Sequence, residues 1–263
     1  MMKSYLGLWL LLAVTFALFT VLSVVDNVKI GNFEFRTANI HKRLTNVEKL
    51  PMEEELEVET ELCHEPVSVS ETVLDTTSQR IMIVGDSMLE GLIPRLAAYA
   101  KHNNHKLYSV IWYASSSKYW ATCDTLERYI KKYKPTYIFM ALGANELFIR
   151  NIKELRRDYV KTIVKKFGDI PYVWIGPPNA KKDTGINELL QENVPADRFF
   201  LSRGMKFSYT KDGIHPTKAS ASQWMDSVVR WMPTHCLNQI VLETPEISKA
   251  QSDALVMISP PKD

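Results

Sequence analysis

The chain has 263 residues, of which 46% are hydrophobic and 24% charged, which is enough apolar content for one substantial core with appended segments. Its formal net charge of +2 is close to balance and argues against a nucleic-acid partner, which normally requires a dominant basic patch. The six histidines are scattered and no Cys-x-x-Cys pair occurs, so the sequence implies no metal site and no cofactor.

The first expected element is an apolar helix at the amino terminus. Tyr5 to Val25 carry no charged side chain, and at a rise of ~1.5 Å per residue they would span about 31 Å, the thickness of a bilayer's hydrocarbon core. The run is longer than that of a removable signal peptide, which favours an uncleaved signal anchor within residues 1–28. Lys3 before the run places the amino terminus in the cytoplasm and the rest of the chain outside, in a periplasm or at a cell surface.

Residues 29–78 differ in character from the rest of the chain. They include the acidic run Met52–Glu61 and part of a Ser/Thr-rich stretch over 68–79. Such a composition buries little apolar area and predicts an extended or partly disordered stalk, although the alternation over Glu55–Glu59 is also compatible with an edge strand.

Residues 241–263 contain three prolines and predict a loosely attached tail. The three cysteines are Cys63, Cys123 and Cys236. A bridge between Cys63 and Cys236 is compatible with an oxidising compartment, but the sequence does not fix a pairing.

Residues 79–240 alternate short apolar runs with longer helical periods, which is typical of βαβ units. This pattern predicts an α/β fold, a three-layer sandwich around five parallel strands. Apolar stripes at helical spacing lie between the strands and belong to the core. Pro94 is expected in the first turn of the first regular helix. The strands are expected at 81–84, 107–112, 137–142, 172–175 and 199–201, and the stripes over 89–100, over 152–163 (Ile152, Leu155, Tyr159 and Ile163) and over 221–232.

A serine and a histidine lie in polar segments that flank these elements. Ser87 directly follows the first strand, and His215 precedes the last helix with Asp212 three residues upstream. A serine hydroxyl is a poor nucleophile until an imidazole accepts its proton, and the imidazole works best when a third group fixes its tautomer. Ser87, His215 and Asp212 are therefore the candidates for a nucleophile, a general base and an orienting carboxylate.

Asn145 follows the third strand and so lies at the same edge of a parallel sheet as Ser87. Its amide could donate to an oxyanion, a role whose loss typically costs roughly 100- to 1,000-fold in rate.

Three segments, Gly-Asp-Ser at 85–87, Gly-x-Asn at 143–145 and Asp-x-x-His at 212–215, resemble three of the four blocks of the SGNH, or GDSL, hydrolase family in order and spacing. The resemblance covers about residues 79–235. It implies the flavodoxin-like strand order 2-1-3-4-5 for the five-stranded sheet. It also implies that Ser87 is the nucleophile, that His215 is the general base oriented by Asp212, and that Asn145 and the Ser87 N–H belong to the oxyanion hole.

One block departs from the family pattern. The family usually has a glycine in the loop after its second strand, whereas this loop reads Trp-Tyr-Ala-Ser-Ser-Ser-Lys over residues 112–118. By the resemblance, a serine N–H, that of Ser116, would replace the glycine N–H in the oxyanion hole. The departure indicates a variant of the family, closer to its cell-surface or acetyl-handling branches than to the secreted lipases.

Aromatic residues near the expected strand ends suggest a carbohydrate substrate, because aromatic faces can stack on sugar rings. The alternative for Trp120 and Trp174 is packing beneath the helices. The residues expected to border the cleft are Asp86, Gly143, Trp112, Tyr113 and Pro178.

Together these features predict a membrane-anchored serine esterase that acts on O-acyl, most simply O-acetyl, esters of an extracytoplasmic carbohydrate. An O-acetyltransferase would use the same residues. A lysophospholipase or lipase-like acylhydrolase is also compatible with them, as is a catalytically inactive relative that binds glycans. The sequence does not indicate which protein, if any, would supply an acyl donor.

Overall fold

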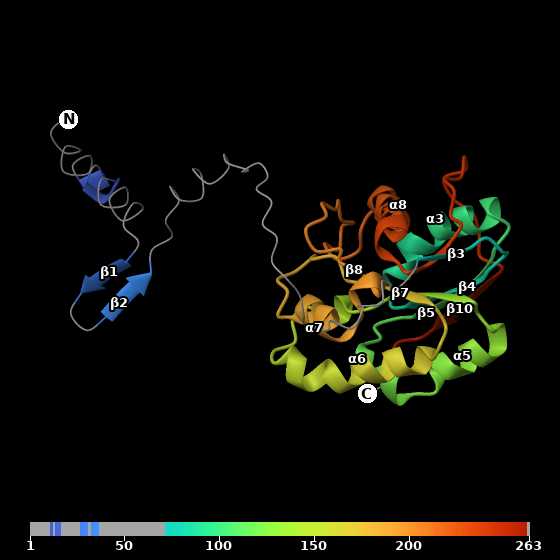
Figure 1. The fold of residues 1–263 in the computed structure, drawn as a ribbon, viewed down its shortest axis with the longest axis horizontal. Coiled ribbons are helices and arrows are strands. Elements are labelled where there is room, and N and C mark those ends of the chain that lie inside the picture. Colours follow the sequence, from blue (N-terminus) through green and yellow to red (C-terminus); the bar gives the residue numbers. More distant parts are fainter. Residues whose placement is uncertain (1–10, 13, 17–26, 31–32, 37–71, 262–263) are drawn as a thin grey trace, which may run out of the picture. The chain divides into compact units, whose positions relative to one another are not determined.

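A computed structural model describes residues 11–12, 14–16, 27–30, 33–36 and 72–261 of the chain, in two units that divide after Val67 (Figure 1). In the first unit, residues 11–12 and 14–16 are helical, and β1 (Asn27–Ile30) pairs antiparallel with β2 (Phe33–Arg36). Most of the expected anchor and the acidic run lie outside the described residues. Within the described residues, no helix combines the length and the apolarity needed to cross a bilayer.

The second unit is built on a six-stranded sheet in the order β10-β5-β4-β6-β7-β8, and every neighbouring pair is parallel. The five strands expected from the sequence are present and keep the order 2-1-3-4-5, so the α/β class is confirmed. Their apolar runs are buried on both faces, as the strands of a parallel sheet covered by helices should be. The strands are β4 (Arg80–Gly85), β5 (Lys106–Trp112), β6 (Tyr137–Ala141), β7 (Tyr172–Ile175), β8 (Phe199–Phe200) and β10 (Ala254–Ile258).

The sixth strand corrects the prediction of five strands and of a loosely attached tail. β10 pairs with β5 from Ala254 beside Tyr108 to Ile258 beside Trp112. The segment before it is also fixed, because Asp253 Oδ2 accepts the Leu107 N–H at 2.9 Å. The sequence Ala-Leu-Val-Met-Ile over 254–258 is compatible with a strand, but the prolines before and after it favour a loose tail. The compact domain therefore extends beyond residue 240.

A two-stranded parallel sheet includes the amino-terminal end of the domain. β3 (Val73–Asp75) lies beside β9 (Asn238–Ile240), directly after the last helix. The Val73 N–H also donates to Leu237 O at 2.7 Å. The end of the predicted stalk, from Val73 onward, is thus part of the folded domain.

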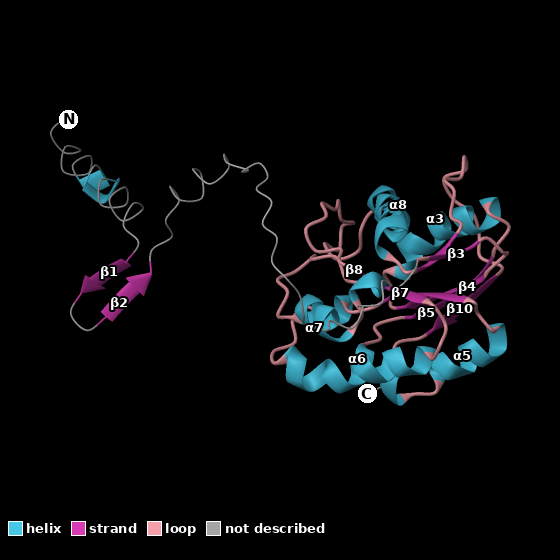
Figure 2. Cartoon of the chain, in the orientation of Figure 1, coloured by secondary structure: helices cyan, strands magenta, loops and turns pink. Residues whose placement is uncertain are grey.

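Helices cover both faces of the sheet, as Figures 1 and 2 show, with α3 and α8 on one face and α5 and α6 on the other. The side chains of β4 alternate accordingly: Ile81 and Ile83 join the core under α3 and α8, and Met82 and Val84 join the opposite core. The helices are α3 (Leu89–His102), α4 (Ser117–Thr122), α5 (Thr125–Tyr133), α6 (Ile152–Phe167), α7 (Ile186–Asn193) and α8 (Lys218–His235), with short 3₁₀ turns η2 (Ala144–Glu146) and η3 (Ala196–Arg198).

The helical stripes expected from the sequence are largely buried, with two differences. Leu155 is 52% exposed, and α3 begins at Leu89, so that Pro94 lies inside the helix and not in its first turn. Trp120 and Trp174 are buried, which supports the packing alternative for both. Their indole N–H groups donate to Ser115 Oγ and to Leu142 O.

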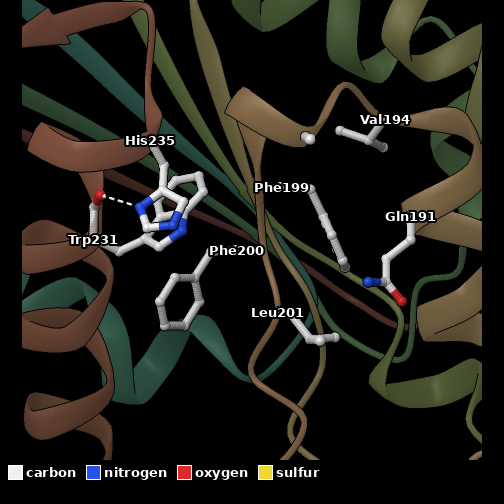
Figure 3. A pocket seen from close by; sticks show the side chains of 8 residues that line it. Gln191, Val194, Phe199, Phe200, Leu201, Trp231 and His235 are labelled. Carbon is white, nitrogen blue, oxygen red and sulfur yellow. Dashed lines mark hydrogen bonds between the residues drawn. The ribbon is translucent and has the colours of Figure 1, made fainter. Parts of the chain in front are cut away.

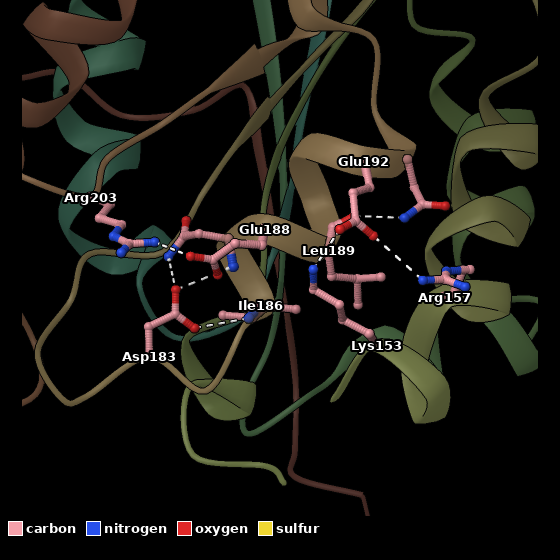
Figure 4. A network of polar contacts seen from close by, with 10 residues as sticks. Lys153, Arg157, Asp183, Ile186, Glu188, Leu189, Glu192 and Arg203 are labelled. Atoms are coloured by element: carbon pink, nitrogen blue, oxygen red, sulfur yellow. Dashed lines mark hydrogen bonds and ion pairs between the residues drawn. The ribbon is translucent and has the colours of Figure 1, made fainter. Parts of the chain in front are cut away.

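The loop after β7 is fixed by polar contacts around α7 (Figure 4). Asp183 Oδ1 accepts the N–H groups of Gly185 and Ile186, each at 2.8 Å, at the start of the helix. On the outer face, Glu192 pairs with Lys153 and Arg157 of α6. These contacts hold α7 against α6 beside the carboxyl edge of the sheet.

Among the described cysteines, Cys123 and Cys236 are free thiols, and Cys236 is buried. Burial raises the pKa of the Cys236 thiol to about 12. Cys63 lies outside the described residues.

Candidate active site

Ser87 lies in the turn between β4 and α3. The turn begins at Gly85, where φ is +158° and an added Cβ would lie 1.9 Å from Ala141 O in the neighbouring strand, so that a side chain has no room. Asp86 N–H then donates to Ala141 O at 3.2 Å, and Glu90 N–H donates to Ser87 O at 3.2 Å. Ser87 thereby keeps a partly exposed side chain at the carboxyl edge of the sheet, before the first turn of α3.

His215 lies in a tight loop directly before α8. Thr210 N–H donates to His215 O at 2.8 Å, and Gly213 N–H donates to Thr210 O at 3.0 Å. Gly213 has φ of +68°, in the left-handed region that favours glycine. Thr217 then caps α8, with its hydroxyl oxygen accepting the Ser220 N–H at 3.3 Å.

The structure brings the three predicted side chains into one line of hydrogen bonds. Ser87 Oγ lies 2.8 Å from His215 Nε2, and His215 Nδ1 lies 2.7 Å from Asp212 Oδ2. These distances match the arrangement in which an imidazole accepts a serine proton while a carboxylate fixes its tautomer.

Asp212 is held as a carboxylate by four donors. Besides the imidazole, its Oδ1 accepts the backbone N–H groups of Ile214 at 2.8 Å and His215 at 3.0 Å and the Thr210 hydroxyl at 2.8 Å. The Ile214 N–H, followed by the His215 side chain, holds the pKa of Asp212 well below its usual range. The orienting group is therefore ionised at neutral pH.

Asp86 is fully buried next to Ser87. Its Oδ1 accepts the Met88 N–H at 3.0 Å, and its Oδ2 has no hydrogen-bond partner. Burial, with a smaller contribution from the nearby charge of Glu146, raises the pKa of this carboxyl to about 7. The side chain lies beneath the site, which differs from the expectation that Asp86 borders the cleft.

Two of the predicted oxyanion-hole residues, Asn145 and Ser116, follow β6 and β5, the two strands that flank β4 in the sheet. Asn145 is in η2, after β6, and donates one N–H from Nδ2 to Ser115 O at 2.9 Å. An amide nitrogen carries two hydrogens, so a second donor is left for a ligand. Ser116, in the loop after β5, is partly exposed in an extended conformation with φ of −132°.

Most of the other residues expected to border the cleft have little exposed surface. Trp112 is 7% exposed, and Gly143 and Pro178 are buried. Tyr113 keeps exposed surface, and its hydroxyl donates to Glu90 Oε1 at 2.5 Å. This bond raises the pKa of Tyr113 to about 12. Of these residues, Tyr113 alone retains a side chain that faces solvent at the edge of the sheet.

An apolar groove of about 470 Å³ adjoins Tyr113 and Glu90, between the first turns of α3 and the edge strand β10. Leu255 and Met257 of β10 are 53% and 60% exposed, because α3 does not cover this edge of the sheet. The apolar lining comes from Ile93, Pro94, Ile111, Leu255 and Met257.

A second cavity, of about 290 Å³, lies between α7 and α8 and is lined by Phe199, Phe200, Trp231 and His235 (Figure 3). Trp231 and His235 belong to the last turns of α8, whereas His215 precedes its first turn. An 18-residue helix is about 27 Å long, so this cavity lies far from the predicted nucleophile.

Sequence reasoning missed three residues that support the site: Thr210, Glu146 and Arg156. Glu146 is fully buried, directly after Asn145, and its Oε1 accepts a hydrogen bond from Arg156 Nε at 2.7 Å. The adjacency to Asn145 was a usable signal for Glu146. Arg156 offered none, because its role depends on how α6 packs.

Across the described part of the chain, no cluster of three or more His, Cys, Asp or Glu side chains could hold a metal ion.

No family model matches this chain, and no curated protein does. Among solved structures, the crystal structure of TesA is similar at 18% identity, covering 57% of this chain and 96% of that one, with a TM-score of 0.44. The psychrotrophic esterase EstA from Pseudoalteromonas sp. is similar at 15% identity, over 59% and 99% of the two chains, with a TM-score of 0.43. The salicylyl-acyltransferase SsfX3 from a tetracycline biosynthetic pathway is similar at 16% identity, covering 60% of this chain and 55% of that one, with a TM-score of 0.39.

Proposed function

We propose that the protein is a serine ester hydrolase or acyltransferase that acts on an O-acyl, most simply O-acetyl, ester of a carbohydrate outside the cytoplasm. The observation that carries the proposal is the line of hydrogen bonds from Ser87 Oγ through the His215 imidazole to Asp212. Such a line activates a serine hydroxyl as a nucleophile at neutral pH.

In the proposed mechanism, His215 Nε2 accepts the proton of the Ser87 hydroxyl as Oγ attacks the ester carbonyl. The carbonyl oxygen becomes an oxyanion, for which Asn145, Ser116 and the Ser87 N–H are the donors. His215 then gives its proton to the departing alkoxide, which leaves an acyl-serine. Water or an acceptor hydroxyl attacks the acyl group, and His215 takes the new proton and returns it to Ser87.

Two features support a carbohydrate ester. Tyr113 and Phe148 present aromatic surface in loops at the carboxyl edge of the sheet, and Phe148 is 61% exposed. The predicted signal anchor would place the domain within reach of exported glycans. Hydrolysis and transfer differ only in the nucleophile of the second step, so both belong to this proposal.

The apolar groove beside Tyr113 favours a second candidate, an acylhydrolase for longer acyl chains such as those of lysolipids. Burial of each CH₂ group contributes about 0.8 kcal/mol, so a chain that occupied the groove would show rising kcat/KM with length. For an acetyl-specific enzyme the groove would bring no such gain.

The proposed function is tested with the full-length protein and p-nitrophenyl acetate. We expect a burst of p-nitrophenol that disappears in Ser87→Ala and persists in Ser227→Ala, which removes an exposed hydroxyl on α8. Matching traces for wild type and Ser87→Ala would favour the inactive glycan-binding relative.

A series of p-nitrophenyl esters from acetyl to dodecanoyl separates the two candidates. Highest kcat/KM on acetyl supports the carbohydrate O-acetyl ester. Rising kcat/KM with length, lost in Met257→Glu, supports the longer-chain acylhydrolase.

A further inference from the structure

Glu146 is a fully buried carboxylate at the end of η2 whose two oxygens both bind Ser117. Oε2 accepts the Ser117 N–H at 2.9 Å, and Oε1 accepts the Ser117 hydroxyl at 2.8 Å. Arg156 of α6 donates from Nε to Oε1 at 2.7 Å and compensates the charge. A buried carboxylate is costly unless it is paired and hydrogen-bonded, and such charge-assisted bonds are stronger than neutral ones.

The same turn contacts the loop on the other side of Ser116. Asn145 Nδ2 donates to Ser115 O at 2.9 Å. Ser115 Oγ in turn accepts the Trp120 indole N–H at 2.9 Å. The two residues that flank Ser116 are therefore both tied to η2, and Ser115 and Ser117 are buried.

These bonds cross the carboxyl end of β4. The loop that contains Ser116 follows β5, and η2 follows β6, and these two strands are the neighbours of β4 in the sheet. Ser87 follows β4 directly. The fastened loop and the predicted nucleophile thus lie at the same edge of the sheet.

We infer that Glu146 is a positioning residue that, together with Asn145, fastens the 115–117 loop so that the Ser116 N–H faces the oxyanion formed by attack of Ser87. This inference rests on the proposed function. The loop has no glycine, and its flanking bonds select one backbone conformation. Arg156 also offsets the negative charge of Glu146, which would otherwise oppose a developing oxyanion.

The first test measures the loop itself, by amide hydrogen exchange of the full-length protein at residues 112–118. In Glu146→Gln we expect the Ser117 amide to exchange roughly 10- to 100-fold faster, because a neutral amide replaces a charge-assisted acceptor. Glu192→Gln is the matched control, since Glu192 is also an ion-paired glutamate but its side chain is 44% exposed, on α7, where it pairs with Lys153 and Arg157 (Figure 4). Unchanged exchange in Glu146→Gln would overturn the inference whatever the activity.

The second test uses kinetics. We expect Glu146→Gln to lower kcat by about 10- to 100-fold with little change in KM, because the oxyanion exists only after attack. Inhibition by a boronic acid, which mimics the tetrahedral state, should weaken by a similar factor. Glu192→Gln should match wild type in both measurements.

The outcomes separate the inference from the proposed function. Faster exchange with unchanged kcat and boronic acid affinity would overturn the positioning role. A wild type with no Ser87-dependent burst would overturn the proposed function and the catalytic part of the inference, while the exchange data would still decide whether Glu146 holds the loop.

Discussion

Asp212→Asn tests whether the carboxylate, and not only its position, is required at the site. If the new amide oxygen takes the place of Oδ1, it keeps the three donors of that oxygen, the N–H groups of Ile214 and His215 and the Thr210 hydroxyl. The amide nitrogen then faces His215 Nδ1 at the 2.7 Å position of Oδ2. Two donors cannot share this contact, so the imidazole proton moves to Nε2, which can no longer accept the Ser87 proton.

The exposure of the pair sets the size of the effect. The same change in a buried serine protease triad lowers kcat by about 10⁴-fold. Here the side chains of His215 and Asp212 are 38% and 46% exposed, so water can replace part of the lost interaction. We therefore expect kcat to fall by about 100- to 1,000-fold, with KM nearly unchanged.

The assay is steady-state hydrolysis of p-nitrophenyl acetate by the full-length protein, with thermal unfolding as a check on folding. Thr210→Val is the matched control, because it removes one donor to Asp212 without touching the contact to the imidazole. It should lower kcat by less than about 10-fold, since the two backbone donors to Oδ1 and the contact of Oδ2 with the imidazole all remain. A folded Asp212→Asn protein with kcat like that of Thr210→Val would refute the role given to the carboxylate.

Three further predictions concern stability. Gly85→Ala should lower the free energy of unfolding by about 2 to 4 kcal/mol in denaturant titrations, because its Cβ would lie 1.9 Å from Ala141 O. Gly168→Ala, where the added Cβ meets nothing within 4 Å, should cost less, only the penalty of its positive φ, about 1 to 3 kcal/mol. For Asp86, the folded-state pKa of about 7 lies above the ordinary value of 3.8, so stability should fall as pH rises from about 4 to about 7, and Asp86→Asn should flatten this slope in thermal melts. A chain that ends at residue 252 lacks β10 and should lose more than about 2 kcal/mol, measured by denaturant unfolding, because Val256 and Ile258 pack against the core.

Each of these predictions has a clear contrary result. Equal losses in Gly85→Ala and Gly168→Ala would mean that β4 and β6 can separate without cost. An unchanged pH slope in Asp86→Asn would assign that slope to other groups. Full stability without residues 253–263 would mean that β10 is an accessory strand.

Much of the site could be predicted because its signals are local. Gly85, Asp86 and Ser87 follow directly on an apolar run, and a parallel sheet brings the carboxyl ends of its strands to one edge. The spacing of Asp212 and His215 is also local, since three residues of loop bring the carboxylate to both the imidazole and the backbone N–H groups.

The hydrogen bonds by which Glu146 and Asn145 hold the 115–117 loop could not be predicted in the same way. Glu146 and Ser117 are 29 residues apart and meet because β5 and β6 flank β4. The burial of Trp112, which was expected to border the cleft, depends on distant packing in the same way, since its ring packs against Tyr119 and Trp120.

The local sequence pattern was enough to predict five of the six strands of the central sheet, most of the helical stripes, and the candidate nucleophile, base and orienting carboxylate. These depend on the periodicity and chemistry of neighbouring residues, which folding does not alter. Contacts between distant segments make β10 the sixth strand of the sheet, open a groove beside Tyr113, and let Glu146 and Arg156 hold the 115–117 loop. Each of these features depends on which distant segments are in contact, and those contacts are determined by the burial of apolar side chains and the pairing of strands across the whole domain.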